Sequence, residues 1–314
     1  MNGNLVVFGA SGFLGRHLIE VARKSGCGLR AVTRQTNPLM GTPGVEWIQA
    51  DLADVSSLER VLHRDDTVLN LAFMPSAGTA ENLAAVDNLV SVCSKRGVKR
   101  LIHCSTAMVA GATKAHTIDE ATECRPVTSY ERCKLALEQR VLAVAQSSMG
   151  VVILRPTAII GPGSANLVTL ARSLLSGSPV LNYLRRSVFG HRRMHLVPVS
   201  TVVSAILHLA QSPSQIDGET FYVSADDDPD NSFAVVERLL RSSLGLPFFQ
   251  AQAIPVPPGL LSVALRLRGR SDVDPERAYL WNKLRQTGFR PNETLADAIC
   301  KFGAWFLKSG NRPG

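Results

Sequence analysis

The chain has 314 residues, 45% apolar and 19% charged, so we expect a sizeable folded core, and no segment is disordered by composition. The net charge of +8 fits nucleic acid, a membrane surface or an anionic small molecule as a partner. Aromatic residues make up 6% and no nucleic-acid module is visible, so an anionic cofactor and substrate explain the charge better. A solvated basic surface is the plain alternative.

The sequence shows no signal for secretion, for a membrane span or for a metal site. The N-terminus lacks the basic region of a secretory signal, and no uninterrupted apolar run of about 20 residues predicts a membrane span. The six cysteines are scattered without a CxxC pair, so we expect reduced thiols, no metal site and a cytoplasmic protein.

Short apolar strands alternate with amphipathic helices through the first half of the chain. We predict strands at 5–8, 29–33, 45–49, 67–71, 100–103 and 151–154, and helices at 12–24, 55–62, 79–96 and 129–147. This order predicts an α/β fold, a Rossmann-like doubly wound parallel sheet with right-handed crossovers.

The rhythm changes after Gly163. Here we predict helices at 167–175 and 202–211, a strand at 220–223, and a basic, irregular stretch at 182–194. We expect a smaller, mostly helical substrate lobe. The predicted division is a dinucleotide-binding domain over 1–162 to which 196–225 returns, a substrate-binding lobe over 163–195 and 226–291, and a C-terminal helix over 292–314.

A glycine triplet with the spacing G-x-x-G-x-x-G follows the first predicted strand. Glycines between a strand and a helix permit a tight turn and a close approach to phosphate, and the helix N-terminus attracts a pyrophosphate. The predicted cofactor-binding residues at this turn are Gly9, Ser11, Gly12, Phe13, Leu14 and Gly15.

The end of the second predicted strand decides between NAD and NADP. NAD enzymes place an acidic residue there for the ribose hydroxyls, whereas this chain has Thr33 and Arg34. A guanidinium can pair with the 2′-phosphate, so we expect NADP(H), with NAD(H) as the alternative. Later strand ends add further cofactor contacts, namely Asp51, Leu52, Leu71, Ala72 and Phe73.

Tyr130 and Lys134 are four residues apart on a predicted helix and therefore face the same way. A phenol with a pKa near 10 is a poor base at neutral pH, but a neighbouring Lys⁺ and a cationic nicotinamide lower that pKa. Ser105 and Thr106 follow the strand at 100–103, where a doubly wound sheet binds ligands. A glycine turn that can bind a dinucleotide, together with an acid/base pair, indicates a redox enzyme.

These features resemble the extended short-chain dehydrogenase/reductases of the nucleotide-sugar epimerase/dehydratase superfamily. Further segments are similar to the family's N-V-x-G-T, S-S/T-x-x-V-Y-G, R-P-x-x-V-Y-G-P-G and V-H-V-D-D-V-A-x-A motifs, namely 82–86, 105–111, 155–163 and 197–205.

The resemblance implies roles for individual residues. Thr106 matches the family's catalytic Ser/Thr, with Ser105 as the less favoured neighbour. Tyr130 matches the acid/base and Lys134 its helper, which also grips the nicotinamide ribose. The residues expected beside the nicotinamide are Pro156 and Ile159.

Departures from the family pattern concern the substrate. Ala107 and Met108 stand where sugar-nucleotide 4,6-dehydratases carry Asp-Glu, so dehydration is disfavoured and Met108 is a candidate substrate contact. Ala110, Pro198 and Thr201 replace the Tyr of V-Y-G and the His and second Asp of V-H-V-D-D.

The stretch 185–193 carries four arginines, and family members use an arginine near here for the substrate diphosphate. Guanidinium suits phosphate, so Arg185, Arg192 and Arg193 are candidate substrate-binding residues, although Arg193 falls one place short of the family position. An exposed basic loop is the alternative. We interpret the segment 254–270 as a lobe helix, with contact to a membrane surface as a second reading.

The resemblance implies an NADP(H)-dependent oxidoreductase, most simply a 4-keto-sugar-nucleotide reductase. The alternatives are an epimerase that retains its cofactor, a reductase or dehydrogenase of a lipid, steroid-like or small carbonyl compound, and a non-catalytic cofactor sensor. The sensor is disfavoured because Tyr130 and Lys134 are both present. The family also implies a homodimer formed through helices equivalent to 79–96 and 129–147.

Overall fold

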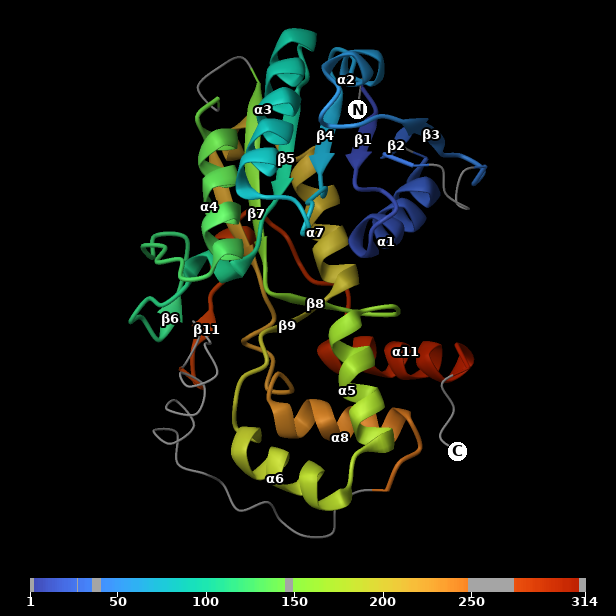
Figure 1. The fold of residues 1–314 in the computed structure, drawn as a ribbon, viewed down its shortest axis with the longest axis vertical. Helices are drawn as coiled ribbons and strands as arrows, with labels where there is room; N and C mark the ends of the chain where they lie inside the picture. The colour runs from blue at the N-terminus through green and yellow to red at the C-terminus, as the bar shows by residue number, and fades with distance from the viewer. Residues whose placement is uncertain (1–2, 27, 36–40, 145–148, 248–273, 311–314) are drawn as a thin grey trace.

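A computed structural model describes residues 3–26, 28–35, 41–144, 149–247 and 274–310 (Figure 1). Its centre is a parallel sheet of seven strands in the order β10-β7-β5-β4-β1-β2-β3. This confirms the predicted doubly wound sheet. The strands are β1 (Leu5–Phe8), β2 (Leu29–Thr33), β3 (Glu46–Gln49), β4 (Thr67–Asn70), β5 (Arg100–Cys104), β7 (Gly150–Pro156) and β10 (Glu219–Val223).

The direction of winding reverses at β1, which pairs with β2 on one side and β4 on the other. Leu5 lies opposite Leu29 of β2 and Thr67 of β4. All residues of β1, β2, β4 and β7 are buried, as strands covered on both faces must be. The chain segments that follow β1 and β4 run to opposite faces of the sheet at this switch point, which is where doubly wound sheets bind ligands.

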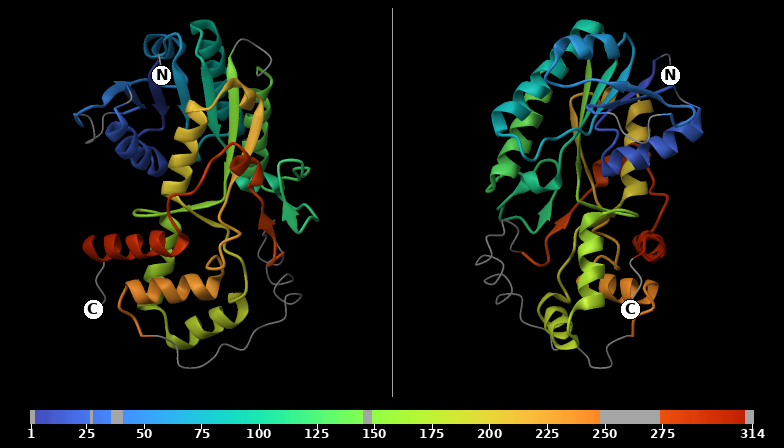
Figure 2. Two further views of the ribbon diagram at one scale, coloured as in Figure 1. Left: turned by 180° about the vertical axis from the view of Figure 1, so that it is seen from behind. Right: turned by 45° about the vertical axis from the view of Figure 1, so that its right-hand side comes forward.

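Helices cover both faces of the sheet (Figure 2). Leu5 and Val7 pack in one core with α1 (Phe13–Ala22) and α7 (Val199–Gln211). Val6 and Phe8, which point the other way, pack in a second core. The helices of that second face are α2 (Val55–Val61), α3 (Thr79–Arg96) and α4 (Ser129–Leu142).

A smaller helical lobe lies below the carboxyl edge of the sheet (Figure 1). Its own core gathers Leu167, Leu240 and Phe302. The lobe helices are α5 (Ala165–Ser176), α6 (Pro179–Phe189), α8 (Phe233–Ser243) and α11 (Leu295–Lys308), and the short α10 (Asn282–Gln286) precedes α11. The mostly helical C-terminal region is therefore as predicted, while the residue boundaries of the division remain an interpretation.

Two small parallel sheets connect distant parts of the chain. β8 (Ala158–Ile160) pairs with β9 (Leu196–Pro198), and β6 (Thr117–Ile118) pairs with β11 (Ala278–Tyr279). The second pairing brings Tyr279 beside the loop that precedes α4. Three short 3-10 turns complete the described structure, at Arg23–Ser25, Ala107–Ala110 and Ser214–Ile216.

The prediction of an irregular stretch at 182–194 was wrong for its first half, which belongs to α6. The Ser178 side chain accepts a hydrogen bond from Leu181 N, and a proline opens the helix. This start signal lies outside the stretch that was interpreted as irregular. The segment 254–270, expected to form a lobe helix, lies outside the described residues. No helix within the described ranges is long and apolar enough to cross a membrane.

Candidate active site

The glycine turn after β1 is closed so tightly that side chains would not fit. Gly9 has φ +80°, and a Cβ there would lie 2.9 Å from Ala72 N. A Cβ on Gly15 would lie 2.4 Å from Gly9 O, so the glycine lets α1 pack directly on the turn. The N-terminus of α1 is thereby held at the end of β1, where its backbone N–H groups can receive an anionic group.

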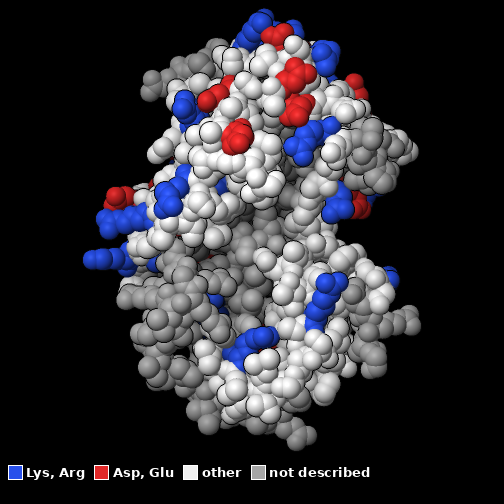
Figure 3. Space-filling view, viewed as in Figure 1, with Lys and Arg blue, Asp and Glu red and all other residues white. Residues whose placement is uncertain are grey.

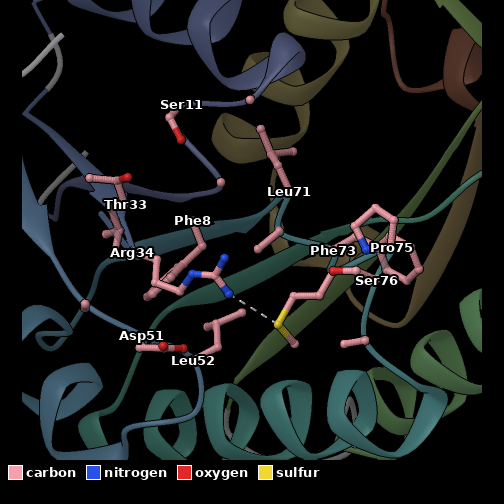
Figure 4. A pocket seen from close by; sticks show the side chains of 17 residues that line it. Phe8, Ser11, Thr33, Arg34, Asp51, Leu52, Leu71, Phe73, Pro75 and Ser76 are labelled. Atoms are coloured by element: carbon pink, nitrogen blue, oxygen red, sulfur yellow. Dashed lines mark hydrogen bonds between the residues drawn. The ribbon is translucent and has the colours of Figure 1, made fainter. Parts of the chain in front are cut away.

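A pocket of about 470 Å³ opens beside this turn (Figure 4). Met74, Pro75, Ser76 and Ala77, which follow β4, form part of its wall. Most of the predicted cofactor residues line the pocket, namely Gly9, Ser11, Gly12, Thr33, Arg34, Asp51, Leu52, Leu71, Ala72 and Phe73.

Phe13, Leu14 and Gly15 begin α1 and do not line this pocket. The Leu14 side chain is buried in the core, and the Phe13 ring packs edge-on against His17 at 5.1 Å. Their predicted contribution is therefore confined to the backbone of the first helical turn.

Arg34 reaches into the pocket from the end of β2 (Figure 4). Its Nη1 lies 3.9 Å from Met74 Sδ, and its backbone carbonyl accepts a hydrogen bond from Gln49 Nε2. No carboxylate among the described residues forms an ion pair with Arg34. The guanidinium can therefore pair with a bound anion without first breaking a salt bridge.

The start of α4 is fixed by a capping box, in which Thr128 and Glu131 satisfy each other's backbone N–H groups. One turn into this helix, Lys134 is 4% exposed and its Nζ donates to Cys104 O at 2.9 Å. Tyr130 lies on the same face and packs edge-on against Phe73, with ring centroids 5.4 Å apart.

Burial sets the acid–base properties of this pair. Loss of solvent raises the pKa of Tyr130, while a hydrogen bond with Thr106 acts in the opposite direction. Burial also lowers the pKa of Lys134. The direction for Tyr130 is opposite to the expected lowering, because desolvation of the phenolate outweighs the favourable contacts in the protein alone. A lowering by a cationic nicotinamide stays a prediction.

A second pocket, of about 280 Å³, lies between the end of β5 and the helical lobe. Figure 3 shows a hollow at mid-height of the molecule, with basic side chains on the lobe below it. The residues that line the second pocket are Thr106, Ala107, Met108, Gly111, Thr157, Ala158, Asn166, Arg192, Met194, His195 and Tyr279.

Tyr130 lines neither pocket, but it contacts a lining residue of each. Its ring contacts Phe73, which lines the first pocket, and its hydroxyl interacts with Thr106, which lines the second. Thr106 also caps a 3-10 turn by accepting from Met108 N at 3.3 Å, so its side chain has a fixed direction. A group bound in the second pocket at Thr106 would therefore meet the phenol of Tyr130.

Three other predicted residues lie nearby without lining either pocket. Ser105 is buried, and its Oγ has no hydrogen-bond partner among the described residues. Pro156 ends β7, and Ile159 lies in β8 and packs on the core. The structure therefore favours Thr106 over Ser105 as the hydroxyl that meets a substrate.

Of the three predicted arginines, the structure brings Arg192 to the second pocket. Arg185 Nη1 donates to Ser173 Oγ of α5 at 2.7 Å, and Arg193 Nη1 donates to Asp226 O at 2.5 Å. Both bonds are internal to the lobe and give these two side chains structural partners.

Sequence reasoning missed the pocket residues Asn166, Met194, His195 and Tyr279. Met194 and His195 directly follow the arginine-rich stretch 185–193, and this adjacency was the only signal for them. Asn166 and Tyr279 come from α5 and β11, and their placement depends on the packing of the lobe.

The model of the NAD dependent epimerase/dehydratase family matches residues 5–224. The chain belongs to this family and is thus an enzyme of the nicotinamide-dinucleotide-dependent, extended short-chain dehydrogenase type. The UDP-glucose 4-epimerase of Vibrio cholerae is 31% identical over 240 residues, which are 74% of this chain and 70% of that protein.

Two reductases are also similar. The 2-alkyl-3-oxoalkanoate reductase of Stenotrophomonas maltophilia is 31% identical over 176 residues, 52% of this chain and 53% of that protein. The dTDP-4-dehydrorhamnose reductase of Mycobacterium tuberculosis (strain H37Rv) is 28% identical over 229 residues, 66% of each. The matches thus span between about half and two-thirds of these reductases.

Solved structures confirm the fold. The UDP-glucose 4-epimerase of Thermotoga maritima, determined with UDP-glucose, superposes with a TM-score of 0.72 at 20% identity, covering 98% of this chain and 99% of that one.

Proposed function

We propose that this enzyme uses NADP(H) to reduce a keto group of a nucleotide sugar, most simply as a 4-keto-sugar-nucleotide reductase. The observation that carries the proposal is the position of Tyr130, which contacts the wall of the cofactor pocket and the hydroxyl of Thr106 in the second pocket. A phenol placed between a dinucleotide and a carbonyl can transfer a proton as the carbonyl carbon changes its oxidation state.

A bound nicotinamide would supply the hydride for the carbonyl carbon. Tyr130 donates its phenolic proton to the carbonyl oxygen, which becomes the product hydroxyl. Thr106 donates a hydrogen bond to the same oxygen and orients it. Lys134 holds the cofactor ribose, and its positive charge stabilises the phenolate that remains until solvent returns the proton.

The cofactor preference rests on Arg34. The tight glycine turn, the open N-terminus of α1 and the guanidinium at the end of β2 together fit a dinucleotide that carries a 2′-phosphate. NADPH is the usual reductive pool, which agrees with a net reduction. NAD(H) is the alternative that the family name allows.

The substrate class rests on the second pocket and on the relatives. Arg192 supplies a guanidinium for an anionic group such as a diphosphate. The similar UDP-glucose 4-epimerase and dTDP-4-dehydrorhamnose reductase are named for nucleotide sugars. Ala107 and Met108 replace the acidic pair of dehydratases, which argues against dehydration.

The direct test incubates purified protein and NADPH with 4-keto sugars carrying dTDP, UDP or GDP, and follows NADPH by absorbance and the sugars by chromatography. We expect one NADPH oxidised per hydroxyl formed with one of the nucleotides. Conversion of a sugar without net NADPH consumption would instead support the epimerase alternative.

A lipid-like or small carbonyl substrate is the second candidate. Met108, Met194 and Ala158 make part of the second pocket apolar, and one similar protein is a 2-alkyl-3-oxoalkanoate reductase. Turnover of a 2-alkyl-3-oxoalkanoate, with no turnover of any keto nucleotide sugar in the same assay, would favour this candidate.

A further inference from the structure

His195 adopts a backbone conformation that is rare for its residue type. It has φ +54°, and Asp65 is the only other non-glycine residue in the described ranges with a positive φ. Strained backbone of this kind persists where the surrounding structure over-determines it, often at a ligand site. His195 lies immediately before β9 and lines the second pocket.

Hydrogen bonds on both sides hold this conformation. Asn231, which is buried, accepts from Leu196 N at 3.0 Å and donates from Nδ2 to Leu196 O at 2.9 Å. The carbonyl of His195 itself accepts from Ala158 N at 2.8 Å. The backbone of His195 is therefore clamped between the start of β8 and the loop after β10.

The imidazole is oriented by a buried carboxylate. His195 Nδ1 lies 2.7 Å from Asp226 Oδ2, and the Asp226 side chain is 2% exposed. The carboxylate also accepts from Tyr279 N at 2.8 Å and from Asn231 Nδ2 at 3.3 Å. Because a carboxylate accepts hydrogen bonds, we assign the proton to Nδ1, which makes Nε2 an acceptor in the neutral ring.

His195 lines the second pocket, and its carboxylate partner Asp226 does not. Thr106 and Tyr279 line the same pocket. The rings of His195 and Tyr279 meet edge-on, 5.1 Å apart and at 88°, which restricts the imidazole plane. A histidine fixed in backbone, tautomer and ring plane therefore lines the pocket that also contains Thr106.

We propose that His195, oriented by Asp226, is a substrate-binding residue whose Nε2 accepts a hydrogen bond from a hydroxyl of the substrate. This inference rests on the proposed function, because it requires the substrate to enter the pocket at Thr106. It narrows the substrate to a molecule with a hydroxyl near its reacting carbonyl, as a hexose ring has. The role is binding and orientation, and no proton transfer is assigned to His195.

The test uses matched ligands that differ in the sugar. Protein saturated with NADP⁺ is titrated in a calorimeter with UDP-glucose and with UDP, and in parallel with dTDP-glucose and with dTDP. We expect the wild-type protein to bind the sugar nucleotide of one pair more tightly than the nucleoside diphosphate. The affinity ratio, which is the affinity for the sugar nucleotide divided by that for its nucleoside diphosphate, isolates the contribution of the sugar.

Two variants separate the two nitrogens of His195. His195→Asn keeps a donor for Asp226 and tolerates a positive φ, but it lacks the second ring nitrogen, Nε2. We expect it to reduce the affinity ratio about three- to tenfold, the value of one hydrogen bond, while affinity for the nucleoside diphosphate stays constant. Asp226→Ala should also reduce the ratio, because the imidazole then loses the acceptor at Nδ1 that fixes its tautomer and orientation.

The possible outcomes test the role of His195 separately from the proposed function. An unchanged ratio in His195→Asn, with wild-type melting temperature and NADPH affinity, would overturn the role of His195 and leave the proposed function intact. An equal loss of affinity for both members of a ligand pair would also overturn it, because the defect would then not concern the sugar. If the wild-type protein bound none of the four ligands and neither a GDP-sugar nor GDP, the nucleotide-sugar proposal and this inference would both be overturned.

Discussion

Tyr130 is 38% exposed, yet desolvation is the main cause of its raised pKa. Its replacement by Phe removes one oxygen and leaves the ring against Phe73. We expect Tyr130→Phe to reduce turnover at least a hundredfold, the usual contribution of a positioned general acid, because no other group donates the proton. Affinity for NADPH, measured by calorimetry, should stay within twofold. Wild-type turnover by this variant would exclude Tyr130 as the acid.

The pH dependence of the reduction follows from the raised pKa of Tyr130. Reduction requires the protonated phenol, and a raised pKa extends its protonated range to higher pH. We expect kcat/KM for reduction to stay level through neutral pH and to fall only as pH rises through this raised pKa. The reverse oxidation requires the phenolate, so its rate should increase with pH. An alkaline limb for reduction well below the pKa of free tyrosine would contradict this assignment.

Arg34 provides a test of cofactor choice at a single side chain. Arg34→Ala removes the guanidinium from the first pocket without disturbing an ion pair of a described residue. We expect NADPH affinity to fall about 10- to 100-fold, as for the loss of a charge-assisted hydrogen bond, and NADH affinity to stay constant. The dissociation constants for NADPH and NADH both come from fluorescence titrations of the same protein, so NADH is the internal control. Equal losses for the two dinucleotides would refute the 2′-phosphate contact.

The placement of residues that depends on local spacing was predictable from the sequence, whereas their roles stay predictions. The glycine turn, Arg34 and the Tyr130–Lys134 pair each lie within one strand–helix unit, and the structure brings them to one region. Arg185 and Arg193 were not separable from Arg192, because the direction of each side chain depends on its hydrogen bond within the lobe. Tyr279 could not be assigned to the pocket from the sequence. Its strand, β11, pairs with β6, which lies about 160 residues earlier in the chain.

At the scale of elements, α4 is anchored to the sheet by a buried ion pair. Arg155 of β7 makes hydrogen bonds from Nε and Nη2 to Glu138, including one of 2.6 Å, and Glu138 is 1% exposed. Glu138 lies one turn beyond Lys134 on the helix that carries Tyr130. The pair therefore fixes α4, with Tyr130 and Lys134, relative to the end of the sheet.

Glu138→Gln leaves the Arg155 charge buried without its carboxylate. We expect the free energy of unfolding to fall by about 3–5 kcal/mol, the usual cost of removing one partner of a buried pair. The matched control is Glu123→Gln, which removes an exposed partner of Arg125 and should leave the denaturation midpoint unchanged. Similar midpoints for both variants in urea would show that the buried pair is not an anchor.

Element type was predictable where the hydrophobic period was clear, as in α1, α3 and the buried strands. The prediction of element type failed at α6, where Asn182, Arg185 and Arg186 gave a polar pattern and the capping Ser178 lay before the interpreted stretch. The two small sheets were also missed as pairings. Strands of two or three residues carry too few side chains to show a period.

At the scale of the whole molecule, the homodimer implied by the family remains a prediction. α3 and α4 lie side by side on one face of the sheet (Figure 1), where two such pairs can form a four-helix contact. We expect sedimentation at micromolar concentration to give twice the mass of one chain. Arg140→Glu on α4, where Arg140 lies 3.8 Å from Asp87 of α3, should shift the protein toward the monomer. A monomer in the wild-type protein would contradict the prediction.

The distribution of the two pockets along the chain has a consequence for biosynthesis. The described lining of the first pocket comes from residues 8–77, whereas the described lining of the second pocket begins at Thr106 and ends with Tyr279 of β11. During translation, the residues of the first lining emerge from the ribosome some 200 residues before Tyr279. A chain arrested between the two would therefore contain the whole lining of the first pocket and only part of the lining of the second.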